Sequence, residues 1–293
     1  MRPRSWPRTA DVGAVRLALE RGAALLQEAE VGSPRHDAEA LLAHVLGCTR
    51  ADLLTLREVP PDAEAAYGSL LLRRAGREPL QHLVGSAAFR HVEVAVGPGV
   101  FIPRPETELV AGAAIAEALA VGAAGGRPVV VDLCAGSGAI ALAVADEAPL
   151  AEVHAVERSA AACEWLARNA AGSRVHVHRA DAATALPGLD GSVDVVVSNP
   201  PYVPESDRPR MDPETLRHDP PEALWGGGSD GLEVPGVVIS AAARLLRPGG
   251  LLALEHAEGQ GAGVRVLLGS GPWTEVATHR DLAGRERFAT ARR

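Results

Sequence analysis

Hydrophobic residues change their spacing near residue 85. Before that point they recur at the interval of a helix, and Val15, Leu19 and Leu26 fall on one helical face. After it, short apolar runs alternate with stretches of helical spacing. The pattern predicts a helical N-terminal part, followed by a part in which strands and helices alternate.

The segment GSPRHDAEALLAHVLG predicts a helix whose two ends are marked. Ser33 is a candidate N-cap, Pro34 takes the first helical position, and Gly47 supplies a stop. Thr49 and Asp62 are candidate caps for two further helices. These signals favour an all-helical domain that ends before the change in spacing.

Glycines and short alternation between residues 86 and 104 indicate a hairpin or an extended linker, and a helical pattern resumes after Pro105. The first ten residues are basic but lack the apolar region of a signal peptide, so we expect a disordered tail. The expected organisation is a tail (1–10), a helical substrate-docking domain (11–85), a hairpin or linker (86–104) and a larger domain (105–293).

Five apolar runs in the larger part are candidate strands: residues 128–134, 152–157, 174–181, 193–201 and 250–257. The first of them is uninterrupted, which is typical of a parallel strand covered on both faces. Helical stretches between the runs predict right-handed crossovers and an α/β fold with a parallel sheet. Ligands of such sheets bind beyond the carboxyl ends of the strands.

The chain of 293 residues suits one large or two ordinary domains and carries a net charge of −8. This acidic charge disfavours a broad nucleic-acid surface. Its three cysteines, Cys48, Cys134 and Cys163, form no CxxC pair, which argues for a reduced cytoplasmic protein without disulfides or a metal site. No apolar run is long enough to cross a bilayer, so no membrane partner is expected.

A glycine-containing loop follows the first strand in VVVDLCAGSGAIA. Gly136 and Gly138 allow a close approach of the backbone to a ligand, and the helix that follows offers free N–H groups. This spacing alone also fits an ordinary strand-to-helix turn. Glu157, about 20 residues further on at the end of the next strand, is placed to accept hydrogen bonds from ribose hydroxyls. The two features together indicate a nucleoside-containing cofactor.

Asp181 ends the third strand, where a carboxylate can accept a hydrogen bond from an adenine amino group. Ala182 leaves room beside the ring. A helix N-cap explains this aspartate equally well, so both interpretations stay open.

The run VVVSNPPYVP ends in a corner that calls for a functional explanation. Asn199 and Pro200 both precede a proline, which holds them extended, and neither proline can donate to a sheet. We predict a stiff, exposed corner that offers the Asn199 side-chain oxygen and the Pro200 carbonyl as acceptors, with Tyr202 as a flat surface. It forms a seat for a planar –NH2 group, either an amide or an amino-purine.

The glycine loop, the strand-end acid and the NPPY corner resemble those of class I S-adenosylmethionine-dependent N-methyltransferases. Over almost the whole chain, the sequence resembles the release factor glutamine methyltransferases. RHDAEALLAHVLG is similar to their helical N-terminal domain, and REPLQHLVG and FIPRPETE are similar to their linker and the entry to their catalytic domain. NPPYVP, HDPPEALWGGGSDGLEV, LLALEHAEGQG and RDLAGRERF follow in the family's order. The departures are Cys134-Ala135, where Gly-Thr is frequent, and Ala182, where an aromatic residue often packs.

The resemblance implies a Rossmann-like class I fold and a methyl transfer from S-adenosyl-L-methionine, which leaves S-adenosyl-L-homocysteine. The acceptor would be the side-chain amide of the glutamine in the Gly-Gly-Gln loop of peptide chain release factors, and the helical domain would bind the rest of that protein.

The resemblance also implies roles for individual residues. The cofactor would contact Cys134, Ala135, Gly136, Ser137, Gly138, Glu157, Asp181, Ala182 and Asn199. The catalytic corner would be Asn199, Pro200 and Tyr202, with Pro201, Phe101, Pro103 and Arg104 completing the substrate pocket.

Three alternatives remain open at this point. A nucleic-acid N6-adenine methyltransferase uses the same corner but needs a basic face. A nicotinamide dehydrogenase shares the glycine loop and Glu157 but has no use for NPPY. A relative that methylates a ribosomal-protein glutamine shares the chemistry, whereas the N-terminal domain favours a release factor.

Overall fold

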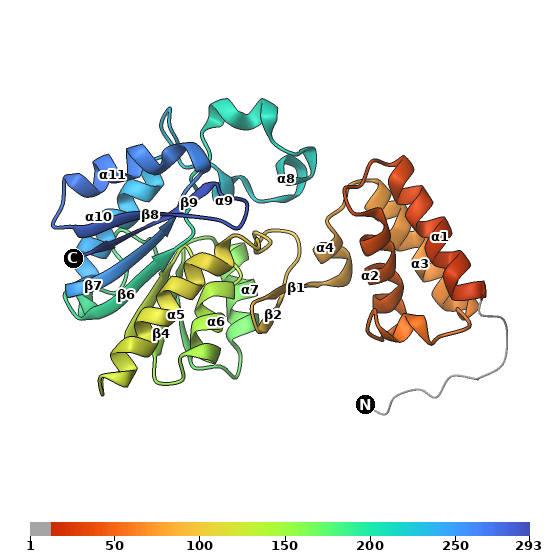
Figure 1. Ribbon diagram of the computed structural model, residues 1–293, viewed down its shortest axis with the longest axis horizontal. Coiled ribbons are helices and arrows are strands. Elements are labelled where there is room, and N and C mark those ends of the chain that lie inside the picture. The colour runs from red at the N-terminus through yellow and green to blue at the C-terminus, as the bar shows by residue number, and fades with distance from the viewer. Residues whose placement is uncertain (1–12) are drawn as a thin grey trace. The chain divides into compact units, whose positions relative to one another are not determined.

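The computed structural model describes residues 13–293, so the tail expected at residues 1–10 lies outside the described residues. The described chain forms two compact units (Figure 1). The first ends at Gly85, and the second spans Ser86–Arg293.

The first unit is helical, as the spacing predicts. It contains α1 (Gly13–Glu28), α2 (Pro34–Leu46), the 3-10 turn η1 (Asp52–Leu54), α3 (Pro61–Ala75) and α4 (Leu80–Val84). Leu26, Leu41 and Leu42 are fully buried in its core. Gly47 ends α2 in the left-handed conformation that glycine adopts without cost.

Two of the predicted helix caps are wrong. Asp62 lies inside α3, and Pro60 precedes that helix instead. Thr49 introduces only the 3-10 turn, where its hydroxyl donates to the Asp52 carboxylate at 2.7 Å. Ser33 does precede α2, but its side chain makes no capping hydrogen bond. Proline at the first helical position, which α2 and α3 share, has a φ angle already suited to a helix.

The second unit begins with the hairpin β1 (Ser86–Phe89) and β2 (Val92–Ala95), followed by α5 (Thr107–Ala123). The predicted alternation of strands and helices follows: β3 (Val129–Leu133), α6 (Ala139–Glu147), β4 (Glu152–Glu157), α7 (Ala160–Ala170), β5 (Val175–Arg179), η2 (Pro187–Leu189) and β6 (Val193–Ser198). The remainder comprises η3 (Glu205–Arg210), α8 (Pro213–His218), α9 (Pro221–Leu224), α10 (Glu233–Leu245), β7 (Leu246–Glu255), η4 (Glu258–Gln260), α11 (Gly261–Gly269), β8 (Thr274–Arg280) and β9 (Glu286–Arg292).

The seven-stranded sheet has the order β5-β4-β3-β6-β7-β9-β8. Neighbouring strands from β5 to β7 are parallel, whereas β9 and β8 pair antiparallel at one edge. The strand order reverses direction between β3 and β6. This is the switch point at which ligands of open α/β sheets bind.

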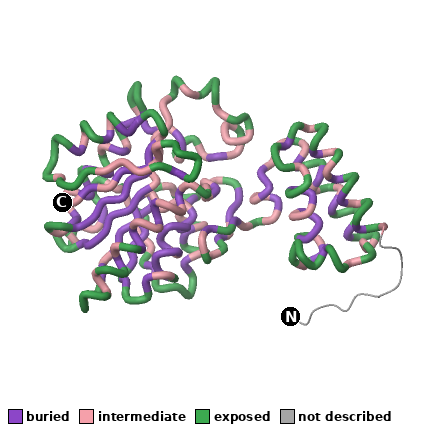
Figure 2. Tube along the Cα trace, in the orientation of Figure 1, coloured by how far each residue is buried: buried purple, intermediate pink, exposed green. Residues whose placement is uncertain are grey.

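Helices cover both faces of the sheet (Figure 1). One face packs on α5, α6 and α7 together with the hairpin, and the other packs on α10 and α11. Successive strand residues point to opposite faces of the sheet. Val195 packs in the core with α5, α6 and α7, and Val196 packs in the core with α10 and α11. Figure 2 shows the central strands buried along their length, as expected for parallel strands between two helical layers.

Asn169 of α7 fastens the hairpin to the sheet's helical layer. Its side chain accepts from the Ala95 amide and donates to the Ala95 carbonyl, both at 2.9 Å. The same amide donates to the Ser137 carbonyl at 3.0 Å. One side chain therefore joins β2, α7 and the loop after β3.

Among residues 13–293, no helix is both long and apolar enough to cross a membrane.

Candidate active site

A cavity of about 260 Å³ opens beyond the carboxyl ends of β3, β4 and β6. It lies wholly within the second unit. Its lining includes most of the residues expected from the sequence: Phe101, Pro103, Cys134, Ala135, Gly136, Ser137, Glu157, Asp181, Ala182, Asn199, Pro200, Pro201 and Tyr202. The predicted glycine loop and the predicted corner therefore share one cavity.

The glycine loop is a tight turn with three left-handed residues, Cys134 (φ 62°), Gly136 (φ 55°) and Gly138 (φ 84°). Two observations argue against a side chain at Gly138. Its φ angle is in the left-handed region, and a Cβ there would lie only 2.5 Å from the Leu166 side chain. Cys134 takes up a conformation that costs a non-glycine residue about 1–2 kcal/mol. Glycine at this position would avoid the strain.

Cys134 is a neutral side chain in this loop. Burial raises the pKa of its thiol to about 12, and the nearby carboxylates of Glu157 and Asp132 add to the effect. The thiol is therefore protonated at neutral pH, and its contribution to the cavity is shape and apolar surface.

Glu157 is held with both of its oxygens in use. Oε2 accepts from the Gly136 amide at 2.9 Å, and Oε1 accepts from the Ser159 amide at 2.7 Å. Each carboxylate oxygen has a second lone pair, which can accept from a hydroxyl in the cavity. Glu157 thus joins the glycine loop to the end of β4 and leaves two acceptor positions for a ligand.

Asp181 caps a turn and not a helix. Its Oδ1 accepts from the Ala183 amide at 2.9 Å, and the chain around it is a turn after β5. The side chain is exposed and borders the cavity. One oxygen therefore has a local structural role, and the other is available to an amino group.

The NPPY corner is less exposed than expected: Pro200 is buried, and Asn199, Pro201 and Tyr202 are only partly exposed. The reason is that neighbouring segments cover it. The Tyr202 carbonyl accepts from the side-chain amide of Gln260 at 2.7 Å, and Val203 exchanges backbone hydrogen bonds with the segment 224–226.

Asn199 has a defined orientation within the corner. Its Nδ2 donates to the Thr107 hydroxyl oxygen at 3.0 Å. Just before it, the Ser198 hydroxyl donates to the Leu133 carbonyl at 2.6 Å, which fixes the end of β6 beside the end of β3. Within residues 13–293, neither the Oδ1 atom of Asn199 nor the Pro200 carbonyl receives a hydrogen bond. The corner therefore offers two oxygen acceptors.

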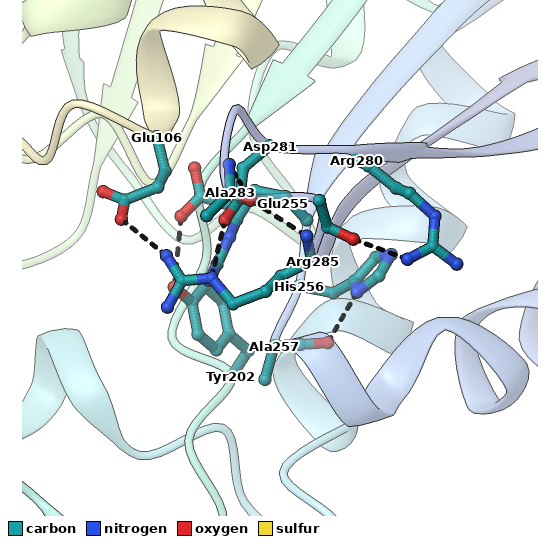
Figure 3. Close-up of polar contacts among 11 residues, drawn as sticks. Glu106, Tyr202, Glu255, His256, Ala257, Arg280, Asp281, Ala283 and Arg285 are labelled. Carbon is teal, nitrogen blue, oxygen red and sulfur yellow. Dashed lines mark hydrogen bonds and ion pairs between the residues drawn. The ribbon is translucent and has the colours of Figure 1, made fainter.

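Tyr202 lines the cavity, but its hydroxyl is directed into the protein. It donates to Oε1 of Glu255 at 3.1 Å (Figure 3). Burial raises the pKa of Tyr202, and the Glu255 carboxylate adds to the effect. The hydroxyl is therefore protonated at neutral pH, and the ring is the part of this side chain that a ligand meets.

Arg104 does not line the cavity in the described structure. Its guanidinium donates to the buried Asp219 carboxylate at 2.5 Å and lies over the Phe101 ring, 4.8 Å from its centroid. Phe101 and Pro103 do line the cavity. Arg104 thus fastens this lining segment to the segment between α8 and α9.

Several polar residues in or near the cavity were not expected from the sequence, among them Thr107, Glu222 and Glu255. Thr107 and Glu255 lie behind the corner, and Glu222 of α9 accepts from the Ser159 hydroxyl at 3.2 Å beside Glu157. Glu255 interrupts an apolar run, which is a usable sequence signal for a buried acid. Thr107 and Glu222 lie in ordinary helical segments and carry no such signal.

Asp132 lies near the end of β3, just before the glycine loop, and the sequence did not predict a role for its side chain. It is fully buried, and its Oδ2 accepts from the Ala141 amide at 3.1 Å, so that the end of β3 is linked to the first turn of α6. Burial raises its pKa well above the ordinary value. Its effect is to hold the loop and the helix N-terminus together.

The arrangement suits the transfer of a group between two bound molecules. One end of the cavity offers backbone N–H groups and a carboxylate suited to a ribose, and the other end offers two acceptors and an aromatic ring. No described side chain at the corner is placed as a strong base.

The chain matches two family models and many curated proteins. Residues 18–85 match the model described as PrmC N-terminal domain, and residues 98–229 match the Methyltransferase small domain. A release factor glutamine methyltransferase of Streptomyces coelicolor is 49% identical over 269 residues, which cover 92% of this chain and 94% of that protein. Proteins of the same name from Mycolicibacterium smegmatis (49% identity; 95% of this chain and 98% of that protein covered) and Mycobacterium tuberculosis (43% identity; 95% and 91% covered) are also similar over most of their length.

Proposed function

Because the chain belongs to the release factor glutamine methyltransferase family, we propose that it methylates the side-chain amide nitrogen of a glutamine in a peptide chain release factor. The methyl donor is S-adenosyl-L-methionine, in keeping with the Rossmann-like class I architecture of the second unit. The glutamine of a flexible Gly-Gly-Gln loop is the acceptor in this proposal.

The observation that carries the proposal is the shared cavity. The loop after β3 and the corner after β6 lie on adjacent parallel strands, so a cofactor and a substrate amide bound there are neighbours. Pairing of the two acceptors at Asn199 and Pro200 with a planar –NH2 group would leave the face of its nitrogen turned towards the cofactor loop.

The residues present fit the proposed cofactor. Cys134, Ala135, Gly136 and Ser137 line the cavity as the seat for its methionine part, and Gly138 lies at the start of α6 directly after them. Glu157 is the partner of the ribose hydroxyls, and Asp181 with Ala182 borders the adenine. The carboxylate of Glu157 supports this role because two backbone amides already hold it in place.

Glu157→Ala should weaken S-adenosyl-L-methionine binding about 10- to 100-fold. Hydrogen bonds to a charged group contribute roughly 1.5–3 kcal/mol, and the variant also releases the Gly136 amide. Calorimetric titration measures the change. Glu152→Gln, at the exposed start of the same strand, is the matched control and should bind normally. Unchanged affinity in Glu157→Ala would remove this residue from the cofactor site.

The chemistry requires alignment more than acid–base catalysis. An amide nitrogen is a poor nucleophile because its lone pair is delocalised, and the cofactor supplies a methyl group on a good sulfonium leaving group. Correct orientation of reactants recovers roughly 7–11 kcal/mol of a barrier. Asn199 and Pro200 hold the amide by its two N–H groups, Tyr202 packs on it, and Phe101 and Pro103 exclude water. The N-methylated amide then loses its extra proton to an acceptor or to water.

The helical unit is proposed as the docking surface for the body of the release factor. A chain that starts at residue 86 should therefore still bind the cofactor but methylate intact release factor at least tenfold more slowly, as expected when a binding contribution of about 1.4 kcal/mol is lost. A free peptide that contains Gly-Gly-Gln is the control, because both chains should methylate it equally. Full activity of the shortened chain on intact release factor would show that the helical unit is not the docking surface.

The proposal also assigns a cellular setting. The three cysteines are free, which suits a reducing compartment, and a substrate that acts in translation suits the cytoplasm. A nucleic-acid substrate is not proposed, because the chain is acidic overall.

Mass spectrometry of a release factor after incubation with enzyme and S-adenosyl-L-methionine tests the function. We expect one added methyl group on the Gly-Gly-Gln glutamine. Ribosomal protein, DNA and RNA, incubated in parallel with labelled cofactor, separate the alternatives. Label in one of these and none in the release factor would overturn the proposal.

A further inference from the structure

Gln260 is a buried side chain beside the NPPY corner, and both of its polar atoms are hydrogen-bonded. It is the last residue of η4 and is 7% exposed. Its Oε1 accepts from the Ala257 amide at 2.9 Å. Its Nε2 donates to the carbonyls of Tyr202 and Asp230, both at 2.7 Å. Gln260 therefore links the segment after β7, the corner after β6 and the loop before α10.

Only one orientation of this amide satisfies its three partners. A backbone N–H can only donate, so the Ala257 amide must meet the side-chain oxygen. A backbone carbonyl can only accept, so the carbonyls of Tyr202 and Asp230 must meet the –NH2 group, whose two hydrogens are then both used. Glutamate has nearly the same shape as glutamine, but its ionised carboxylate has no hydrogen to donate.

The backbone of the NPPY corner has few means of attachment. Two of its four residues are prolines, which have no N–H to donate. In the part of the chain that the structure describes, the only hydrogen bond to the backbone of residues 200–202 comes from Gln260. Gln260 is thus the polar contact that fixes the backbone between the Pro200 carbonyl and the Tyr202 ring.

Two glycines of the loop before α10 pack against the same backbone. A Cβ on Gly231 would overlap the Tyr202 carbonyl oxygen. A Cβ on Gly226 would overlap the Gly231 carbonyl oxygen and lie 2.7 Å from Cα of Tyr202. Carbon atoms that are not bonded to each other pack at about 3.5–4.0 Å, so neither position has room for a side chain. The loop therefore contacts Tyr202 backbone against backbone, which glycine permits.

The residue after the corner is held by the start of the same loop. The Val203 amide donates to the Leu224 carbonyl at 2.8 Å, and the Val203 carbonyl accepts from the Gly226 amide at 3.1 Å. We call Gln260 and residues 224–231 together the corner clamp. The corner clamp holds the backbone at the end of the NPPY corner, and the Tyr202 ring is left to line the cavity.

We propose that Gln260 is a positioning residue for methyl transfer, which fixes the Tyr202 backbone so that the Pro200 carbonyl and the Tyr202 ring hold the substrate amide in line with the cofactor. Gln260 does not line the cavity, so it acts through the corner and not on the reacting atoms. The inference rests on the proposed function for its catalytic consequence. Its structural content, the placement of the corner backbone, is independent of the substrate.

Gln260→Glu tests the proposal with almost no change of shape. The introduced carboxylate can still accept from the Ala257 amide but cannot donate to the two carbonyls. Single-turnover methylation should fall about 10- to 100-fold, because a misplacement of about 1 Å at the reacting groups costs up to about 10²-fold. KM for the release factor should change little. Gln260→Met, which adds no charge, should lose turnover as well and so separates the lost donors from the added charge.

Cofactor titration separates this loss from a folding defect. The cofactor loop is held by the bond of Glu157 to the Gly136 amide and by that of Asp132 to the Ala141 amide, and neither bond involves the corner clamp. Gln260→Glu should therefore bind S-adenosyl-L-methionine about as tightly as the wild type does. Loss of cofactor binding in this variant would assign Gln260 to the folding of the whole unit and would contradict a specific role at the corner.

Gly226→Ala tests the corner clamp through a different contact and leaves Gln260 unchanged. The added Cβ must displace either Tyr202 or the loop, so turnover should fall about 10- to 100-fold here too, with cofactor affinity kept. Gly259→Ala is the matched control, because a Cβ at this neighbour of Gln260 meets no atom within 4 Å. It should react at the wild-type rate. Normal turnover of Gly226→Ala would show that the corner does not depend on the corner clamp.

Labelling with carbonyl-13C tyrosine reads the corner backbone directly, because the chain has only two tyrosines, Tyr67 and Tyr202. The chemical shift of a carbonyl carbon responds to the hydrogen bond that its oxygen accepts. The Tyr202 signal should therefore move in Gln260→Glu and in Gly226→Ala and stay fixed in Gly259→Ala. Tyr67, inside α3, is the internal control and should not move in any of them.

The rate and the label together decide the inference. A Tyr202 signal that is unchanged in Gln260→Glu, or wild-type turnover in that variant, would overturn it. If the wild type leaves release factor unmethylated, the proposed function fails, and the label still decides whether Gln260 places the corner backbone.

Discussion

Asn199→Ala should lower the single-turnover rate of release factor methylation about 10²- to 10³-fold and lower cofactor affinity far less. The variant removes the oxygen that holds one N–H of the substrate amide. It leaves the Gly136–Glu157 contact of the cofactor loop untouched. An interaction of about 2.7–4 kcal/mol that forms mainly in the transition state is thereby lost.

The contacts of Asn199 indicate that its substitution should leave the surrounding structure in place. Its only side-chain partner in the described structure is the Thr107 hydroxyl, and the neighbouring Ser198 keeps its own bond to Leu133. The end of β6 should therefore stay in place. Asn199→Asp retains an oxygen at the same position and should keep more of the rate than alanine does. Near-normal turnover of Asn199→Ala would mean that the corner is only a turn.

Strands buried between two helical layers could be predicted from the sequence, because residues that are buried on both faces form a nearly continuous apolar run. β3, β4 and β6 are short runs rich in valine. β3 and β4 were expected within one residue of their observed bounds, whereas β6 ends at Ser198, three residues before the expected end at Pro201. β8 and β9 were not predicted. β8 is an edge strand with no fully buried residue, so TEVATHR shows no alternation of apolar and polar residues.

The cofactor side of the cavity could be predicted for a different reason: its parts are local. The glycine loop follows its strand directly, and Glu157 ends the next one, so chain order alone brings them to one edge of the sheet. The surroundings of the corner are not local. Gln260, Glu255 and Thr107 come from three distant segments, and no spacing in the sequence shows that they meet Asn199 and Tyr202.

These contacts from distant segments also explain why the prediction that the NPPY corner is exposed was wrong. Two prolines do make the corner stiff, as predicted, but stiffness says nothing about what covers it. The segment 224–226 pairs with Val203, and Gln260 binds the Tyr202 carbonyl, so that only the edge towards the cavity stays open. The corner is thus a wall of the site and not a projection from the surface.

Tyr202 gives the sharper contrast between positioning and acid–base chemistry. Tyr202→Ala should reduce turnover about 10²-fold or more, because it leaves the substrate amide without the ring on which it packs. Tyr202→Phe keeps the ring and should lose about tenfold or less at pH 8, since it forfeits one hydrogen bond.

The structure gives the reason to expect this difference. The Tyr202 proton is already donated to Glu255, away from the cavity, and both burial and that carboxylate raise the pKa of the phenol. A hydroxyl in this state is not available as a base for the substrate. Phenylalanine removes this buried hydrogen bond and keeps the ring, so the loss should be mild.

Single-turnover methylation of release factor by wild type, Tyr202→Phe and Tyr202→Ala at pH 6, 7 and 8 decides between the two roles, with cofactor affinity measured separately. Positioning by the ring predicts a mild Phe variant and a severe Ala variant at every pH. Catalysis by the hydroxyl predicts instead that both variants are equally crippled at pH 8, because the group that moves the proton is absent from each. That second outcome would require the Tyr202 hydroxyl to leave Glu255 and turn to the substrate during the reaction.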